Sequence, residues 1–139
     1  MNDKVTPKLS KADKQEVKRD VKSFKVVDLG YVFSFPDYGA TVAVAPATYA
    51  HDGSPIPWNK AKFMRFSIAW LGEGDIFRRR TGQAQAMNSF YLDRIQTVPT
   101  AIMLQEFGKY SNLDDRRDVK EILQGYFADY VLPTFSHRI

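Results

Sequence analysis

The chain has 139 residues, a mass of 15.9 kDa and a formal net charge of +4. Its length fits one domain, and ten Phe, seven Tyr and two Trp provide large side chains for a core. The absence of cysteine excludes disulfide scaffolds, thiolate zinc sites, iron–sulfur clusters and cysteine nucleophiles.

The positive charge is concentrated at the N-terminus. Residues 1–25 carry eight basic and four acidic side chains, whereas the remaining residues carry twelve of each sign. Ser10 and Asp13 fit a capping box, so this segment is either a solvated helix or a disordered arm. We predict a basic polar arm over residues 1–23 and a single α+β domain over residues 24–139. The start of the chain lacks an apolar signal-peptide core, and no stretch approaches a membrane span, so we expect a cytoplasmic protein without a membrane partner.

Three segments are predicted to be strands, and the first and third of them have apolar residues on one face with a period of two. The first covers residues 27–35 and the second residues 41–45, and the turn signal Pro36–Gly39 between them predicts a hairpin. The third strand is expected over residues 62–71, with its even-numbered apolar residues on one face and Arg65 and Ser67 on the other.

The C-terminal half predicts helices. Asp75 is interpreted as the N-cap of a helix that runs to about Asp93, with Phe77, Ala84, Met87 and Tyr91 on one stripe. Val98-Pro99-Thr100 separates this helix from the next segment, residues 101–110, which is also predicted to be helical. Ser111–Asp114 is a capping box for a last helix that ends at Pro133. Its apolar stripe repeats at three and four residues: Val119, Ile122, Leu123, Tyr126, Phe127, Tyr130 and Val131.

Three strands followed by helices favour an α+β fold. We expect an antiparallel sheet of three or more strands, followed by two or three helices packed on one face.

The motifs of the common enzyme classes are absent from the sequence. His51 and His137 are the only histidines, and no spacing of His or acidic residues resembles a metal-ligand set. Neither a phosphate-binding glycine loop nor a nucleophile elbow is present. A convergence of carboxylates in space stays open, although nothing in their spacing supports one. We therefore predict a protein that is not an enzyme and has no metal or cofactor.

Three consecutive arginines follow the third strand and its glycine turn. Arg78, Arg79 and Arg80 fall in the first two turns of the predicted helix, where cations oppose the helix dipole. Free backbone N–H groups and guanidinium groups placed together suit a phosphate, and Arg65 is a further candidate ligand. At 100° per residue the three arginines fan out, so we expect one to face a ligand, one solvent, and one a neighbouring acid or subunit. The alternative is a solvated helix face with Glu73 or Asp75 as ion-pair partners.

This segment carries a resemblance. The pattern Asp75-x-Phe77-x-Arg79-x-x-Gly82-x-x-x-Ala86 resembles a strand–turn–helix signature of small phage and mobile-element accessory proteins. The chain departs from that signature at Gln83 and Ser89, where basic residues are common. The resemblance covers about a quarter of the chain and implies a non-catalytic accessory binder, in some cases one that opposes host defence by sequestering nucleotides or blocking a protein. It also implies a host-cell cytoplasmic location.

Two other regions are candidate contacts. The basic residues of the arm can follow a nucleic-acid backbone or serve a partner, or can simply be solvated: Lys11, Lys14, Lys18, Arg19 and Lys22. Trp58, in a proline-flanked loop, either packs against the protein or binds a partner protein.

The leading hypothesis from the sequence is a phage-type accessory protein that binds a nucleotide or nucleic acid through its arginines. The alternative is an inhibitor or structural protein that contacts a host protein. We also expect a homo-oligomer, because two chains would let their arginines share one anion.

Overall fold

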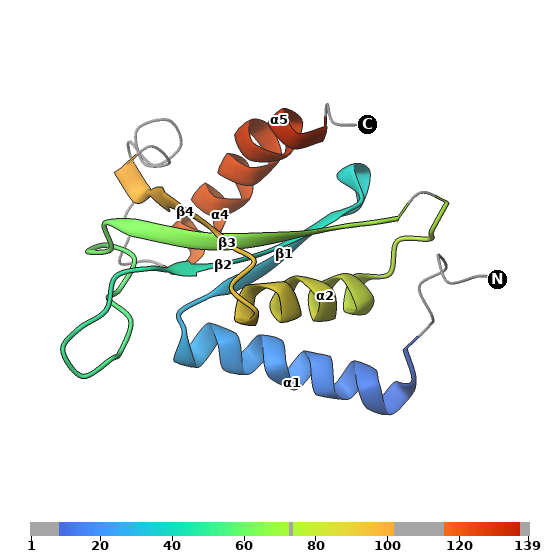
Figure 1. Ribbon diagram of the computed structural model, residues 1–139, viewed down its shortest axis with the longest axis horizontal. Helices are drawn as coiled ribbons and strands as arrows, with labels where there is room; N and C mark the ends of the chain where they lie inside the picture. The colour runs from blue at the N-terminus through green and yellow to red at the C-terminus, as the bar shows by residue number, and fades with distance from the viewer. Residues whose placement is uncertain (1–8, 73, 102–115, 137–139) are drawn as a thin grey trace. The chain divides into compact units, whose positions relative to one another are not determined.

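The computed structural model describes residues 9–72, 74–101 and 116–136 (Figure 1). It contains a four-stranded sheet in the order β1-β2-β3-β4 together with helices, so the α+β class is confirmed. The predicted order, strands first and helices afterwards, is wrong because a helix precedes β1. The chain divides into two compact units, the first built from Met1–Ala45 with Phe66–Gln96 and the second from Pro46–Arg65 with Thr97–Ile139.

Helix α1, Lys11–Val27, lies where a helical or disordered arm was expected. The Ser10 hydroxyl accepts a hydrogen bond from the Asp13 amide at 3.1 Å, which confirms the predicted cap. Val17 and Phe24 are buried, so α1 is not a free arm but packs against the first unit. Helix formation over these residues therefore depends on a small buried stripe within a polar sequence.

The boundary between α1 and the first strand differs from the prediction. Val27 ends the helix, and the amides of Asp28 and Gly30 both donate to the Phe24 carbonyl at 3.0 and 3.1 Å. Leu29 between them has φ 56°, so the helix closes with a left-handed residue. The alternating pattern extends to Val27, but the buried Phe24 ring lies against Gly30 and anchors the helix up to that point.

The predicted hairpin is confirmed. Strand β1, Tyr31–Phe35, pairs antiparallel with β2, Ala40–Pro46, with Tyr31 opposite Val44 and Phe35 opposite Ala40. A 3₁₀ turn, Pro36–Tyr38, connects them, and Gly39 follows with φ 61°. Glycine takes this left-handed conformation without the steric penalty of a side chain.

Strand β3, Phe63–Trp70, is confirmed within a residue at each end, and β4, Gln96–Pro99, is a strand that the sequence pattern did not predict. The Leu71 amide donates to the Gly39 carbonyl at 2.6 Å beside β2 and β3. The Thr100 amide, just after β4, donates to the Lys62 carbonyl, just before β3, at 3.0 Å. Proline is tolerated in β4 because this strand lies at the edge of the sheet order.

Helix α2, Arg79–Tyr91, starts three residues later than expected, because its N-cap is Arg78 and not Asp75. In the first unit α1 and α2 contact each other and β1, and they run side by side in the same direction (Figure 1). Their core with the strands is one cluster of buried residues: Phe24, Ala43, Ala45, Ala86, Met87 and Phe90. The predicted stripe of α2 is partly wrong, because Tyr91 is 58% exposed.

The C-terminal helix continues past its predicted end. Helix α4, Arg116–Tyr126, leads into a π-helical turn, Phe127–Val131, and then into α5, Leu132–Ser136. Pro133 lies in the first turn of α5, where a helix has no need of its missing N–H, so it does not end the chain's helical run. The predicted stripe is buried except for Tyr130, which is 50% exposed. The predicted helix over 101–110 and the capping box at 111–114 lie outside the described residues, apart from residue 101.

Gly30 offers a test of this fold. A Cβ at Gly30 would overlap the ring of Phe24, which is 1% exposed and cannot move aside without disturbing the core. We expect Gly30→Ala to lower the free energy of unfolding by about 1–3 kcal/mol in chemical denaturation. The control is Gly53→Asn, because a Cβ at Gly53 meets nothing within 4 Å and Asn tolerates its φ of 86°. An unchanged stability of Gly30→Ala would contradict the close approach.

Candidate functional site

The arginine turn consists of Arg78, Arg79 and Arg80 at the start of α2. Arg78 occupies the N-cap position, makes no side-chain cap and accepts the first helical hydrogen bond from the Gly82 amide at 2.9 Å. The first turn of α2 contains no acidic residue. Its first amides and these cations therefore present positive charge at the same helix end, an arrangement that does not stabilise the helix itself.

The three arginines have different environments. Arg80 is partly buried, and its Nη1 donates to Oε1 of Gln83 at 2.8 Å. Gln83 is only 2% exposed, so this bond holds the Arg80 guanidinium against the helix. Arg79 is exposed and Arg78 is half-buried, and neither side chain forms a hydrogen bond or ion pair within the described chain. The observed partner of Arg80 is therefore the side-chain amide of Gln83, and Glu73, one of the two acids predicted as partners of the arginines, lies outside the described residues.

The arginine turn and α1 together enclose a hollow of about 270 Å³, here called the basic hollow. It is lined by Leu9, Lys14, Arg78, Arg79, Arg80 and Thr81. Four of these six residues are cationic and none is acidic. Lys14 belongs to the predicted basic arm, so the structure brings together two groups that are 64 or more residues apart in the sequence.

A second hollow of about 240 Å³ adjoins the basic hollow and shares Arg78 and Thr81 with it. Its lining combines apolar residues, among them Trp70 and Phe77, with polar ones, among them Asp75. Thr41 also lines it, is 1% exposed, and its hydroxyl has no hydrogen-bond partner among the described residues. Thr41 and Gln83 were not predicted as site residues, because a polar residue within an apolar pattern gives no signal until its neighbours are known.

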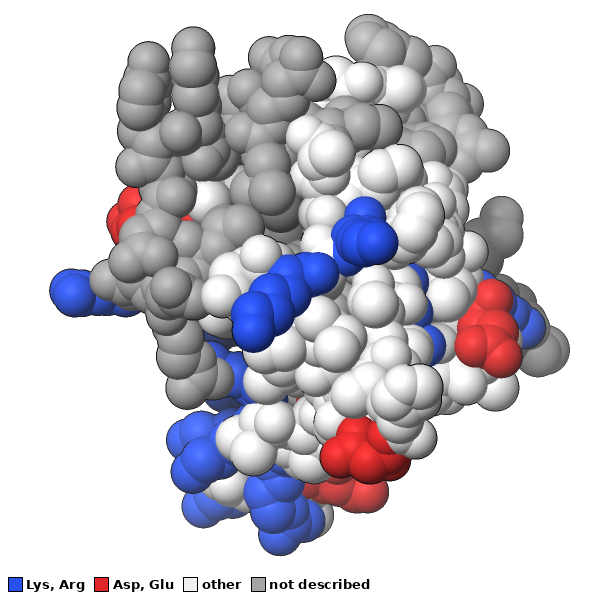
Figure 2. All heavy atoms as spheres, turned by 90° about the vertical axis from the view of Figure 1, so that its left-hand side faces the viewer, with Lys and Arg blue, Asp and Glu red and all other residues white. Residues whose placement is uncertain are grey.

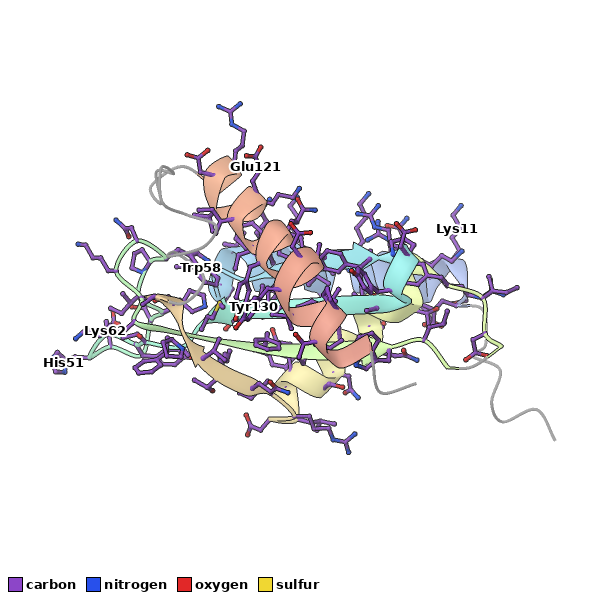
Figure 3. All side chains as sticks on the ribbon, turned by 90° about the horizontal axis from the view of Figure 1, so that it is seen from above. Lys11, His51, Trp58, Lys62, Glu121 and Tyr130 are labelled. Atoms are coloured by element: carbon purple, nitrogen blue, oxygen red, sulfur yellow. The ribbon has the colours of Figure 1, made fainter. Side chains whose placement is uncertain are left out.

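The remaining arm residues are exposed on α1: Lys11, Lys18, Arg19 and Lys22. Figure 3 shows Lys11 projecting away from the start of the helix. Exposure alone does not distinguish a site, since in the view of Figure 2 lysines and arginines lie among acidic side chains on a mainly uncharged surface. The basic hollow differs by its lack of acidic lining.

Arg65 was predicted as a further ligand of the anion. It lies in the second unit, where its guanidinium sits 5.4 Å from the centre of the Tyr49 ring, and it lines neither hollow. A cation–π contact of this kind provides a local role for the side chain.

Trp58 is 7% exposed, so the prediction of a surface contact for a partner is wrong in this structure. In Figure 3, His51 lies at the outer end of the loop and Trp58 lies farther in. The indole packs inward because its large apolar area is removed from water there. Of the two alternatives predicted for Trp58, the structure thus favours packing against the protein.

Two shifted pKa values lie outside the hollows and have local causes. The side chain and backbone amide of Ser54 donate to Oδ1 of Asp52 at 2.6 and 3.0 Å, which lowers the pKa of this exposed carboxyl. Burial raises the pKa of Tyr126, and the nearby Tyr130 raises it further by a smaller amount. Because hydrogen bonds in a turn and burial in a helix explain these shifts, neither group indicates a catalytic acid or base.

Comparison of the chain with protein-family models, with curated proteins and with solved structures finds no match. Within the described ranges, no three His, Asp or Glu side chains gather as metal ligands. None of the helices in those ranges is long and apolar enough to span a membrane. The functional argument therefore depends on the geometry of the basic hollow.

Arg80 and Arg79 provide a matched pair of substitutions. Arg80→Ala leaves the buried Gln83 oxygen without its donor, and we expect the free energy of unfolding to fall by about 1–3 kcal/mol. Arg79→Ala removes an exposed side chain that has no partner among the described residues, and we expect a change within about 0.5 kcal/mol. Urea denaturation measures both values. Equal losses in the two variants would contradict a structural role specific to Arg80.

Proposed function

We propose that this protein is a non-catalytic accessory protein that binds a phosphate-bearing ligand, a nucleotide or nucleic acid, in the basic hollow. The observation that carries the proposal is the lining of this hollow, where Lys14 and the arginine turn meet with no acidic residue among them. Arg78 and Arg79 have no partner in the described chain, so their donors are available to an anion.

The chemistry of the hollow favours phosphate over a simple monovalent anion. Each guanidinium presents a planar set of donors that matches phosphate oxygens, and Lys14 adds a mobile point charge. The start of α2 adds backbone N–H groups and the positive end of a helix dipole, which contributes about 0.3–1 kcal/mol for an anion near an exposed terminus. A phosphate would relieve the mutual repulsion of four cations that the fold brings together.

The resemblance supports the accessory, phage-type part of the proposal, including an anti-defence role in a host cytoplasm. Within its pattern, Gly82 lies against Thr41 and Ala86 is fully buried. These two positions are thus explained by packing of α2 on the strands. Arg79 is exposed at the basic hollow, which fits a ligand contact.

Removing the two unpartnered arginines tests the proposal. We expect Arg78→Gln with Arg79→Gln to weaken binding of pyrophosphate, AMP and the oligonucleotide dT12 at least about tenfold, because charge-assisted hydrogen bonds are lost. Titration calorimetry at low salt measures the affinities. The control, Lys60→Gln with Lys62→Gln, removes the same charge from exposed positions outside the hollow and should bind as the wild type does. If the wild-type protein binds none of the three probes, the proposed function is wrong.

A second candidate is a protein contact, favoured by apolar side chains at the C-terminal ends of α1 and α2. Val26, Val27, Tyr91 and Leu92 are 66, 62, 58 and 56% exposed. The Tyr91 hydroxyl donates to Asp28 Oδ2 at 3.2 Å, which places the two helix ends next to each other. Exposed apolar groups gathered in this way are typical of interfaces, and they fit the predicted homo-oligomer.

Lysine substitutions test this apolar patch without disturbing the helices, since cations are favourable at helix C-termini. If the patch joins two copies, we expect Val27→Lys with Leu92→Lys to convert a dimer into a monomer in sedimentation velocity at high protein concentration. The control pair Lys25→Gln and Asp93→Asn should leave the dimer intact. A wild-type protein that sediments as a monomer throughout would contradict self-association through this patch.

A further inference from the structure

The lysines of α1 lie on one face of the helix. They are separated by three, four, four and three residues: Lys11, Lys14, Lys18, Lys22 and Lys25. At 100° per residue these positions fall within an arc of about 80°. All five are exposed, and none forms a side-chain hydrogen bond or ion pair within the described chain. We call this face the lysine ridge.

The acidic residues of α1 occupy a different face. Asp13, Glu16 and Asp20 lie about 140–160° from the centre of the lysine ridge by the same helical geometry. Charges that alternate along the sequence are therefore segregated around the helix, with the buried Val17 and Phe24 along one boundary. The acids of this helix are not positioned to neutralise its lysines.

Stability of the helix does not explain this arrangement. Like charges three and four residues apart repel each other, as at Lys14 and Lys18 and at Lys18 and Lys22, whereas Glu and Lys at these spacings would attract. The ridge faces solvent and contributes nothing to the buried cluster of the first unit. A row of unneutralised cations indicates a ligand that carries a row of negative charges.

The ridge is continuous with the basic hollow, because Lys14 belongs to both. From Lys11 to Lys25 the helix rises about 21 Å, far more than one phosphate group spans. Successive ridge lysines are separated by roughly one helical turn of 5.4 Å, a spacing that flexible lysine stems can adapt to consecutive phosphates.

We infer that the ligand is a nucleic-acid strand, with one phosphate in the basic hollow and its phosphodiester backbone continuing along the lysine ridge. This inference rests on the proposed function and selects its polymer form over a free nucleotide. Binding of this kind is governed by release of counterions from the phosphates, so it depends steeply on salt and little on base sequence.

The test compares two variants with the same change in net charge. The ridge variant replaces four lysines and keeps the hollow intact: Lys11→Gln, Lys18→Gln, Lys22→Gln and Lys25→Gln. The control variant replaces four exposed cations elsewhere: Lys60→Gln, Lys62→Gln, Arg94→Gln and Lys120→Gln. Circular dichroism and thermal melting establish that both are folded, and fluorescence anisotropy measures binding of labelled dT12 over a range of salt concentrations.

We expect the ridge variant to bind dT12 at least tenfold more weakly at low salt, while its affinity for AMP stays within twofold of the wild-type value. The slope of log affinity against log salt should fall by about 0.7 for each phosphate contact removed, up to about 2.8 for four. The control variant should keep a slope close to that of the wild type.

Distinct results overturn the inference and the proposed function. Suppose that AMP binds through Arg78 and Arg79. If dT12 then binds no more tightly than AMP, or if the ridge and control variants lose equal affinity for dT12, the strand inference is wrong and the anion site stands. Equal binding of polyglutamate with the same dependence on the ridge would also overturn the assignment to nucleic acid. If the wild-type protein binds neither AMP, pyrophosphate nor dT12, the proposed function itself is wrong.

Discussion

The close approach of α2 to the strands determines where the arginine turn lies. Gly82 faces Thr41 so closely that a Cβ at this position would overlap the threonine hydroxyl. One turn later, the Ser67 hydroxyl donates to the Ala86 carbonyl at 2.7 Å, and Ala86 itself is fully buried. These two contacts fix the position of the helix from within, so the arginines that precede Gly82 are held at its start by packing that involves none of them.

This arrangement separates the residues that build the site from those that give it charge. Gln83 is buried and holds Arg80 to the helix, whereas Arg78 and Arg79 keep their donors free within the described chain. A cation at a helix N-terminus opposes the dipole, and three in sequence do so together. The fold therefore tolerates unfavourable charge at a rigid position, a combination that is typical of sites formed for a ligand and not for stability.

Features that depend on neighbouring residues in the chain could be predicted, and features that depend on distant contacts could not. The Ser10 cap and the Pro36–Gly39 turn follow from local backbone chemistry, and both are confirmed. The end of α1 depends on how Phe24 packs against Gly30, and the inward position of Trp58 depends on the fold around its loop. Strand β4 is too short and too polar to be recognised without the strand it pairs with. In the same way, the basic hollow requires Lys14 and the arginine turn to meet, a contact that no local pattern contains.

Net charge hides the organisation of α1, because opposite charges cancel when they are counted along the sequence but not when they are placed around a helix. Asp13 and Glu16 stand next to lysines in the chain, yet the helix turns them to the opposite face. The spacing of the lysines was visible in the sequence once a helix was assumed, whereas their connection to the arginine turn was not. Lys14 supplies that connection, and a field extended over both elements attracts a polyanion more strongly than either group of cations alone.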